Sequence, residues 1–143
     1  MNPSVSRRAF LEGAAALVGA TLVAGCSSGA QPQPTAQAQG EGFSLPNTQL
    51  PKAGEALAFA FPDGQQGLLY HATTGETGAV SARCTHLGCV VQWSDGDLKT
   101  PFVCPCHQSE FDLKGAVLRG PAKEPLAHFK ATQNGAGVDL RRA

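Results

Sequence analysis

The sequence predicts a small all-β domain of antiparallel strands, on the strength of three observations. The chain of 143 residues has room for one compact core. It contains 17 glycines and 10 prolines, a composition that favours short strands joined by turns over helices. In addition, Leu57, Phe59 and Phe61 alternate with small residues, which is the pattern of a strand buried on one face.

The expected strands follow one another at short spacing after residue 55. Pro62, Asp63 and Gly64 end the first of them, and later turns are marked by pairs such as Thr74-Gly75 and Asn134-Gly135. We expect strands near residues 55–61, 67–73, 78–83, 90–93, 98–103, 110–112, 116–118, 127–132 and 137–140.

The charge distribution argues against one class of partner. The formal net charge is +0, and the lysines and arginines are scattered along the chain instead of forming a basic stripe. Nucleic-acid binding needs such a stripe, so we expect no nucleic-acid partner.

Residues 1–26 have the features of an export segment. Two adjacent arginines, Arg7 and Arg8, precede an apolar run from Gly13 to Gly25. This run is shorter than the roughly 20 apolar residues of a membrane-spanning helix, which favours a signal peptide. The string S-R-R-x-F-L resembles the twin-arginine signal, whose pathway carries folded proteins across the membrane; an ordinary signal with two chance basic residues is the alternative.

The end of the export segment suggests a membrane anchor. Val23 to Cys26 resembles a bacterial lipobox, which implies that Cys26 is lipidated and becomes the first residue of the mature protein. Several acyl chains would hold the domain stably at a membrane surface. The alternative is an uncleaved, marginal transmembrane helix. With either anchor we expect the protein on the outer face of the cytoplasmic membrane, the periplasmic side.

Residues 27–50 are expected to form a flexible linker. They include the run Gln31-Pro32-Gln33-Pro34 and alternate alanine, glutamine and glycine, so they lack the apolar content that would order them. The folded domain is therefore expected to span residues 51–143.

Two short stretches carry the chemistry. Cys84–Cys89 reads C-T-H-L-G-C and Cys104–Ser109 reads C-P-C-H-Q-S. A metal site needs thiolates and neutral imidazoles presented by rigid loops, and a hairpin of residues 90–93 and 101–103 would bring the two stretches together. The two stretches offer six side chains that could bind metal, two more than a site with four protein ligands needs. Their spacing alone does not identify the two that are spare.

Residues 84–109 resemble the Rieske signature, C-x-H-x-G-C followed by C-x-C-H-x-S. The resemblance implies a small antiparallel Rieske-type β-sandwich with a cluster-binding subdomain and one [2Fe-2S] cluster per chain. Matched position by position, it implies that two thiolates bind one iron and two imidazoles bind the other. The ligands implied in this way are Cys84, Cys104, His86 and His107.

The resemblance assigns a different role to the other two cysteines of these stretches. It implies that Cys89 and Cys106 form a disulfide between the two loops, which suits an exported protein. The chain has five cysteines, an odd number, and the lipidated Cys26 would account for the fifth.

Further positions are implied to tune the cluster. Ser109 matches a serine whose hydroxyl bonds a bridging sulfide, whereas Phe111 stands where high-potential members carry a tyrosine, which predicts a lower reduction potential. Gly88 allows the backbone to approach the cluster closely. Leu87 is expected to shield the cluster or to contact a partner.

A third segment also matches the family, and one position in the second stretch departs from it. Gly120, Pro121 and Ala122 resemble the proline loop that forms the third wall of the cluster pocket. Gln108 occupies a position where glycine is usual, which puts the local turn conformation in question.

A structural zinc site is the alternative for the same side chains, since two cysteines and two histidines are also a common zinc set. Zinc fingers usually place both cysteines in one element and both histidines in the other, whereas here each loop offers one of each. The spacing therefore favours the iron–sulfur cluster.

The function implied is one-electron transfer by a chain that is not catalytic alone. V-V-x-W after the first loop, and R-G-P-A and P-L-A-H after the second, resemble the iron–sulfur subunit of cytochrome bc-type complexes, which pass electrons from quinol to a c-type cytochrome. The partners would be a cytochrome b-type quinol-oxidising subunit and the c-type cytochrome. The alternatives are a small Rieske subunit of a molybdenum oxidoreductase, similar to that of arsenite oxidase, and a free-standing Rieske lipoprotein.

Overall fold

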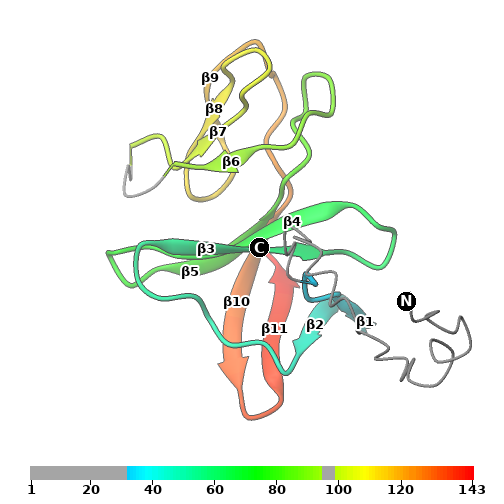
Figure 1. Ribbon diagram of the computed structural model, residues 1–143. Helices are drawn as coiled ribbons and strands as arrows, with labels where there is room; N and C mark the ends of the chain where they lie inside the picture. Colours follow the sequence, from blue (N-terminus) through cyan, green and yellow to red (C-terminus); the bar gives the residue numbers. More distant parts are fainter. Residues whose placement is uncertain (1–31, 95–98) are drawn as a thin grey trace, which may run out of the picture. The chain divides into compact units, whose positions relative to one another are not determined.

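The computed structural model describes residues 32–94 and 99–143, and over these residues the protein is all-β (Figure 1). Every pairing between the named strands is antiparallel, which confirms the predicted fold class. The strands are β1 (Gln37–Gln39), β2 (Gly42–Pro46), β3 (Glu55–Ala60), β4 (Gln66–His71), β5 (Thr77–Ser81), β6 (Gln92–Trp93), β7 (Phe102–Val103), β8 (Glu110–Phe111), β9 (Val117–Arg119), β10 (His128–Asn134) and β11 (Gly137–Arg142).

The expected export segment, residues 1–26, and the lipobox cysteine Cys26 lie outside the described residues. Within the described ranges, the structure contains no helix long and apolar enough to cross a membrane.

The larger sheet has the strand order β1-β2-β11-β10-β5-β4-β3. Its two edges meet, because Thr35, just before β1, forms a parallel bridge with Ala60 at the end of β3. The amide of Ala36 donates to the carbonyl of Ala60 (2.7 Å), and the amide of Ala60 donates to the carbonyl of Pro34 (3.0 Å). The sheet therefore curls on itself and encloses an apolar interior.

The prediction of a flexible linker was wrong for residues 32–50. Strands β1 and β2 lie within this range and extend the larger sheet, with Leu45 opposite Val138 of β11. The side chain of Leu45 is fully buried, and Ala36 is 2% exposed. The alternation of Phe43 and Leu45 with polar neighbours is the strand signal in this segment, and it is too short to stand out from the surrounding alanine and glutamine.

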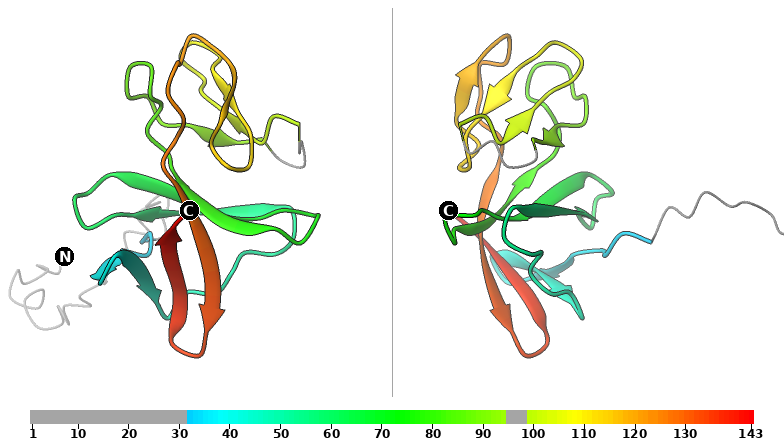
Figure 2. Two further views of the ribbon diagram at one scale, coloured as in Figure 1. Left: turned by 180° about the vertical axis from the view of Figure 1, so that it is seen from behind. Right: turned by 60° about the vertical axis from the view of Figure 1, so that its left-hand side comes forward.

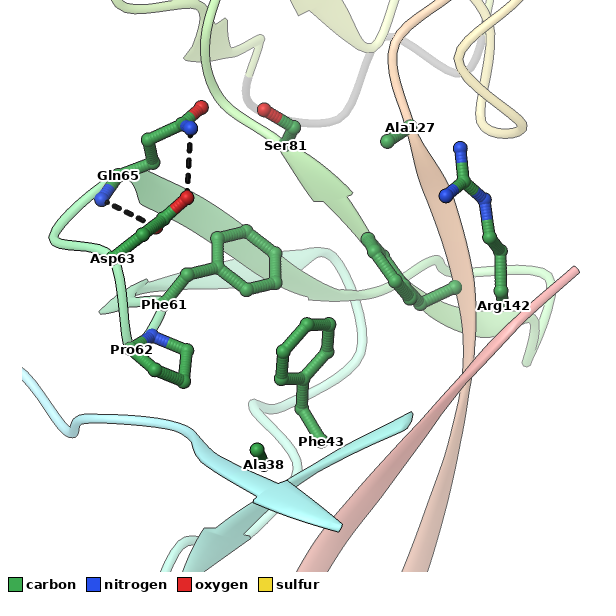
Figure 3. A pocket seen from close by; sticks show the side chains of 10 residues that line it. Ala38, Phe43, Phe61, Pro62, Asp63, Gln65, Ser81, Ala127 and Arg142 are labelled. Atoms are coloured by element: carbon green, nitrogen blue, oxygen red, sulfur yellow. Dashed lines mark hydrogen bonds between the residues drawn. The ribbon is translucent and has the colours of Figure 1, made fainter. Parts of the chain in front are cut away.

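The interior of the larger sheet is packed by the inward side chains of its strands. Phe59 and Leu69 are fully buried at its centre, together with Val138 and Leu140 of β11. Gly67 faces the ring of Phe59 across the β3–β4 pair, and any side chain there would collide with that ring. At one end of this core the rings of Phe43 and Phe61 meet edge to face, 5.1 Å apart (Figure 3).

The smaller sheet has the order β6-β7-β8-β9 and carries both cysteine-containing stretches. The expected hairpin is confirmed, since β6 and β7 pair with Gln92 opposite Val103 and Trp93 opposite Phe102. In Figures 1 and 2 this sheet lies on the side of β3, β4 and β5, away from the turn between β10 and β11.

A second apolar core joins the two sheets, with Tyr70 of β4 and Val80 of β5 packed against Phe102 and Phe111 of the smaller sheet. Tyr70 is fully buried and stacks on Trp93 at a centroid distance of 5.9 Å. Gly78, on the neighbouring strand, leaves room for the tyrosine ring. The cluster-binding subdomain is thus packed onto the larger sheet through this second core, in which Tyr70 is the largest fully buried side chain.

The hydroxyl of Tyr70 also ties the two sheets together. It donates to the carbonyl of Leu113 (2.8 Å) beyond β8 and lies 3.2 Å from Nε2 of His128 on β10. A hydroxyl has one hydrogen, so the imidazole must be the donor in the second bond. Burial, with the nearby carboxylates of Glu76 and Asp112, raises the pKa of Tyr70 well above its usual value. Burial lowers the pKa of His128, which favours the neutral ring.

Replacing Tyr70 by phenylalanine is expected to lower the free energy of unfolding by about 1–3 kcal/mol. The change removes the donor to Leu113 and the acceptor of His128, and leaves both groups in a partly buried environment without a partner. Urea denaturation followed by circular dichroism measures the effect. An unfolding free energy equal to that of the parent protein would show that the hydroxyl does not couple the sheets.

Candidate metal centre

The two cysteine-containing stretches form turns with the same backbone hydrogen bonds. We call Cys84–Cys89 the first loop and Cys104–Ser109 the second loop. In each, the amide of the first residue donates to the carbonyl of the sixth, at 2.8 Å in both loops. The amide of the fifth residue donates back to the carbonyl of the first, at 2.8 Å in the first loop and 2.9 Å in the second. The site is therefore built from one turn geometry used twice.

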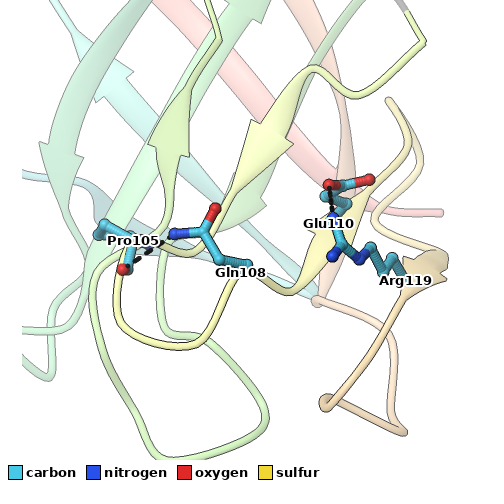
Figure 4. A network of polar contacts seen from close by, with 4 residues as sticks. All are labelled: Pro105, Gln108, Glu110 and Arg119. Carbon is cyan, nitrogen blue, oxygen red and sulfur yellow. Dashed lines mark hydrogen bonds and ion pairs between the residues drawn. The ribbon is translucent and has the colours of Figure 1, made fainter.

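The fifth position of each loop has a positive φ angle, 81° at Gly88 and 60° at Gln108. Glycine adopts this left-handed conformation without steric cost, whereas for a residue with a Cβ it costs about 1–2 kcal/mol. Gln108 nevertheless keeps the conformation of glycine, and its side-chain amide donates to the carbonyl of Pro105 at 3.3 Å (Figure 4). The turn questioned from the sequence is thus of the same type as the glycine turn.

Replacing Gln108 by glycine is expected to raise the unfolding free energy by on the order of 0.5–1 kcal/mol. Relief of the left-handed strain exceeds the extra chain entropy that glycine adds to the unfolded state. Asn47 offers a matched control, because its φ is 55° and asparagine tolerates this region better than glutamine. Thermal unfolding should show a gain for Gln108→Gly that is larger than for Asn47→Gly. Destabilisation by the first substitution would show that the bond to Pro105 outweighs the strain.

Cys84 and Cys104 begin the two loops, and their side chains are buried, 2% and 1% exposed. Both are free thiols. Burial raises the pKa of the Cys84 thiol, and its contact with Cys104 raises it further. The backbone amide of His86 and the hydroxyl of Ser109 donate hydrogen bonds that act in the opposite direction. The site therefore holds two adjacent buried sulfurs, and hydrogen-bond donors point at the sulfur of Cys84. A bound metal would stabilise the thiolate form of both cysteines.

His86 and His107 lie at the outer end of the site. Their rings meet edge to face, with centroids 4.8 Å apart and planes at 88°. Nδ1 of His86 is buried and has no hydrogen-bond partner among the described residues. A buried polar atom without a partner costs free energy, so an unpaired imidazole nitrogen in a loop that begins with a buried thiol has the character of a metal ligand.

The expected disulfide is present and joins the two loops between Cys89 and Cys106, across a sequence separation of 17. The sulfur of Cys104 lies within 4.8 Å of both disulfide sulfurs. Disulfide sulfurs are not thiolates and are poor metal ligands. The bond therefore identifies these two cysteines as the spare pair, which spacing alone could not do.

Ser109 links the second loop to the proline loop. Its side chain is fully buried, and its oxygen accepts a hydrogen bond from the amide of Ala122 (3.0 Å). This segment contains a cis peptide bond between Gly120 and Pro121. The hydroxyl hydrogen remains available for the sulfur side, so Ser109 bridges the proline loop and the site.

The remaining positions differ in exposure. Phe111 is fully buried in the second core, without a hydroxyl to offer, and Leu87 is 69% exposed at the tip of the first loop. Sequence reasoning missed Thr85, whose hydroxyl donates to the carbonyl of Glu124 (2.6 Å) and fastens the first loop to the segment after the proline loop. An exposed pair, Arg119 and Glu110, joins β8 and β9 at 3.0 Å (Figure 4).

Comparison with known proteins gives consistent matches. The Rieske [2Fe-2S] domain family matches residues 44–130. The cytochrome b6-f complex iron-sulfur subunit of Chlorobaculum thiosulfatiphilum is 42% identical over 69 residues, which are 48% of this chain and 37% of that protein. The subunit of the same name from Synechococcus elongatus is 55% identical over 53 residues, 37% of this chain and 28% of that protein. The match thus spans about a third of the length of these curated relatives.

Two solved structures share the fold. The cyanobacterial plasma membrane Rieske protein PetC3 from Synechocystis PCC 6803 is 32% identical, with a TM-score of 0.52, over 60% of this chain and 85% of that protein. The ferredoxin of carbazole 1,9a-dioxygenase from Nocardioides aromaticivorans IC177 has a TM-score of 0.55 at 20% identity, over 70% of this chain and 98% of that protein, a likeness of fold alone. The family match covers more than half of the chain and includes both loops, so the chain belongs to the Rieske [2Fe-2S] domain family and binds a [2Fe-2S] cluster.

Proposed function

We propose that this chain is a one-electron carrier whose cluster is held by Cys84 and Cys104 on one iron and by His86 and His107 on the other. One observation carries this proposal: the two loops that begin with the buried free thiols Cys84 and Cys104 also carry two imidazoles in ring contact. One of these imidazoles has a buried nitrogen without a partner among the described residues. A cluster ligated by two thiolates and two neutral imidazoles accepts and returns one electron, at potentials of about −150 to +300 mV in Rieske centres.

The two histidines also give the site a place for a proton. If His86 binds iron through its buried Nδ1, its Nε2 is left as the ring nitrogen that can face a partner. His107 is exposed beside it. An outward Nε2 can accept a hydrogen bond from a donor and take up its proton, so that one electron and one proton leave a substrate together. The exposed Leu87 next to His86 supplies apolar surface for the same contact.

The partner that these features support best is a cytochrome b-type quinol-oxidising subunit, with a c-type cytochrome as electron acceptor. The relatives named as cytochrome b6-f complex iron-sulfur subunits support this assignment. A second candidate, the small subunit of a molybdenum oxidoreductase or a free-standing lipoprotein, is favoured by Phe111, because a fully buried phenylalanine cannot donate the bond that raises the potential.

The location proposed is the outer, periplasmic face of the cytoplasmic membrane. The twin-arginine motif at Arg7 and Arg8 supports export of the folded protein, and a lipidated Cys26 or an uncleaved helix would tether it. The similar plasma membrane Rieske protein from Synechocystis agrees with a membrane location. Mass spectrometry of the mature N-terminus distinguishes the anchors, since an unmodified Cys26 would remove the lipoprotein proposal.

Purification of the chain from its membranes in mild detergent tests the proposed complex. We expect a cytochrome b to co-purify and its haem to be reduced by quinol together with the cluster. A molybdopterin subunit in its place would reject the quinol complex in favour of the second candidate. A cluster-containing chain without either partner would identify a free-standing carrier.

Replacing Phe111 by tyrosine is expected to raise the reduction potential. A new hydroxyl bond to a ligand cysteine would favour the reduced state by about 1 kcal/mol, which corresponds to about 40 mV for one electron. Redox titration of the cluster by its electron paramagnetic resonance signal measures the shift. An unchanged or lower potential, with the cluster content intact, would show that the bond cannot form from this position.

A further inference from the structure

A pocket of about 440 Å³ opens at the end of the larger sheet's core, and neither the cluster nor its loops contribute to it. It lies where the inward rows of side chains on β2, β3 and β10 end. Its apolar wall consists of Phe43, Phe61 and Phe129, and Figure 3 shows the space between these strands. The volume falls within the range of small-molecule sites.

The three rings form one surface. Phe43 lies 5.1 Å from Phe61 and 5.6 Å from Phe129, and the last two are 5.5 Å apart. Phe61 and Phe129 are each 7% exposed, so both rings are largely buried in the core. Ala38 and Ala127 line the pocket where a larger side chain would have filled it. One wall of the pocket is thus a continuous apolar surface.

One cation stands at the mouth of this recess. On β11 the inward row runs from Val138 and Leu140, both fully buried, to Arg142, which continues the same face beyond the core. Over the described residues, the guanidinium of Arg142 has no ion pair. Arg141, the preceding residue, lies on the opposite face of the strand.

The polar residues across the pocket are already satisfied. The carboxylate of Asp63 accepts hydrogen bonds from the amide of Gln65 (3.0 Å) and from its side-chain nitrogen (2.8 Å). In Figure 3 this pair and Arg142 lie on opposite sides of Phe43 and Phe61. Asp63 keeps its negative charge, but its carboxylate is engaged by two donors, whereas the Arg142 guanidinium has neither a hydrogen bond nor an ion pair among the described residues; it is the charged group of the pocket lining that is free to take a ligand.

We propose that this pocket binds a single-chain amphipathic carboxylate of the fatty-acid type. The alkyl chain would lie against Phe43, Phe61 and Phe129, where burial of apolar surface favours binding. The carboxylate would accept two parallel hydrogen bonds from the Arg142 guanidinium, the geometry that arginine offers to this group. The site is separate from the proposed electron transfer and does not depend on it.

Isothermal titration of the cluster-loaded full chain with decanoate, below its micellar concentration, tests the proposal. We expect saturable binding of one decanoate per chain. The neutral analogue 1-decanol should bind about tenfold more weakly, because it cannot accept the charge-assisted hydrogen bonds that the guanidinium donates to a carboxylate at the pocket mouth. Absence of saturable binding, or equal affinities for the two ligands, would overturn the proposal.

Two arginine variants make the test specific. Arg142→Gln should weaken decanoate binding about tenfold and leave 1-decanol binding unchanged. Arg141→Gln removes the same charge from the neighbouring position and should change neither affinity. Equal losses in both variants would show a general charge effect and reject the site. Phe43→Ala should weaken both ligands, because it removes part of the apolar wall.

Two further measurements check the fold of the variants and the source of the ligand. The visible spectrum of the cluster and the circular dichroism of each variant show whether it is folded, and the exposed Arg142 can be replaced without disturbing the core. Sedimentation with phosphatidylglycerol vesicles tests a membrane source. Binding to vesicles that depends on Arg142, with no binding of free decanoate, would reject the fatty-acid site in favour of a lipid surface.

Discussion

Replacing Cys104 by serine is expected to abolish the iron–sulfur cluster. The side chain is 1% exposed and adjoins the second free thiol at Cys84, while the two other nearby sulfurs, those of Cys89 and Cys106, are held in the disulfide. A serine hydroxyl remains protonated at neutral pH and does not replace a thiolate ligand. The purified variant should be colourless, with little bound iron, whereas the parent protein carries two irons per chain and a reduced-state rhombic resonance signal.

Cys26→Ser is the matched control, because it also removes one cysteine but lies outside the two loops. It should keep the full iron content and an unchanged spectrum. If Cys104→Ser retained two irons per chain with the parent spectrum, the proposed ligand set would be wrong.

Replacing Cys89 and Cys106 together by serine should lower the unfolding free energy by about 3 kcal/mol. The disulfide closes a loop across a separation of 17 residues, and the entropy it removes from the unfolded chain has this size for loops of such length. The double change avoids leaving a reactive thiol beside the buried cysteines. Urea denaturation under non-reducing conditions measures the difference in stability.

The same variant should also lose its cluster faster in moderate urea, because the two loops are no longer joined covalently. The half-life of the visible absorbance follows this process. An unchanged denaturation midpoint together with an unchanged half-life would show that the packing of the second core alone holds the loops together. Cys26→Ser again controls for the loss of a cysteine.

Most of the fold could be predicted from local signals. The strands from Glu55 onward are short alternating segments between glycine and proline turns, and each lies within a few residues of its expected place. The hairpin of β6 and β7 followed from apolar residues flanking two rigid turns. What failed was β1 and β2, because their pairing depends on partners that are distant in sequence: Ala60 for Thr35, just before β1, and β11 for β2.

The site divides along similar lines. The meeting of the two loops could be predicted from the hairpin between them, and the disulfide from the resemblance to the Rieske signature. The links that support them could not, since the bonds from Thr85 to Glu124 and from Ala122 to Ser109 join segments that only the folded chain brings together. The role proposed for Arg142 could not be predicted from the sequence for the same reason. Only the folded chain brings this arginine to the same pocket as the three phenylalanines.

The closure of the larger sheet has a mechanical consequence. A pull applied to the chain at Pro32 would first load the backbone hydrogen bonds that Pro34 and Ala36 form with Ala60. The next hydrogen bonds to be loaded would be those between β1 and β2. Both sets of hydrogen bonds lie outside the smaller sheet. Strain arriving from the N-terminal side would therefore be taken up in the larger sheet before it reached the two loops, so the fold separates the proposed membrane attachment from the proposed site of electron exchange.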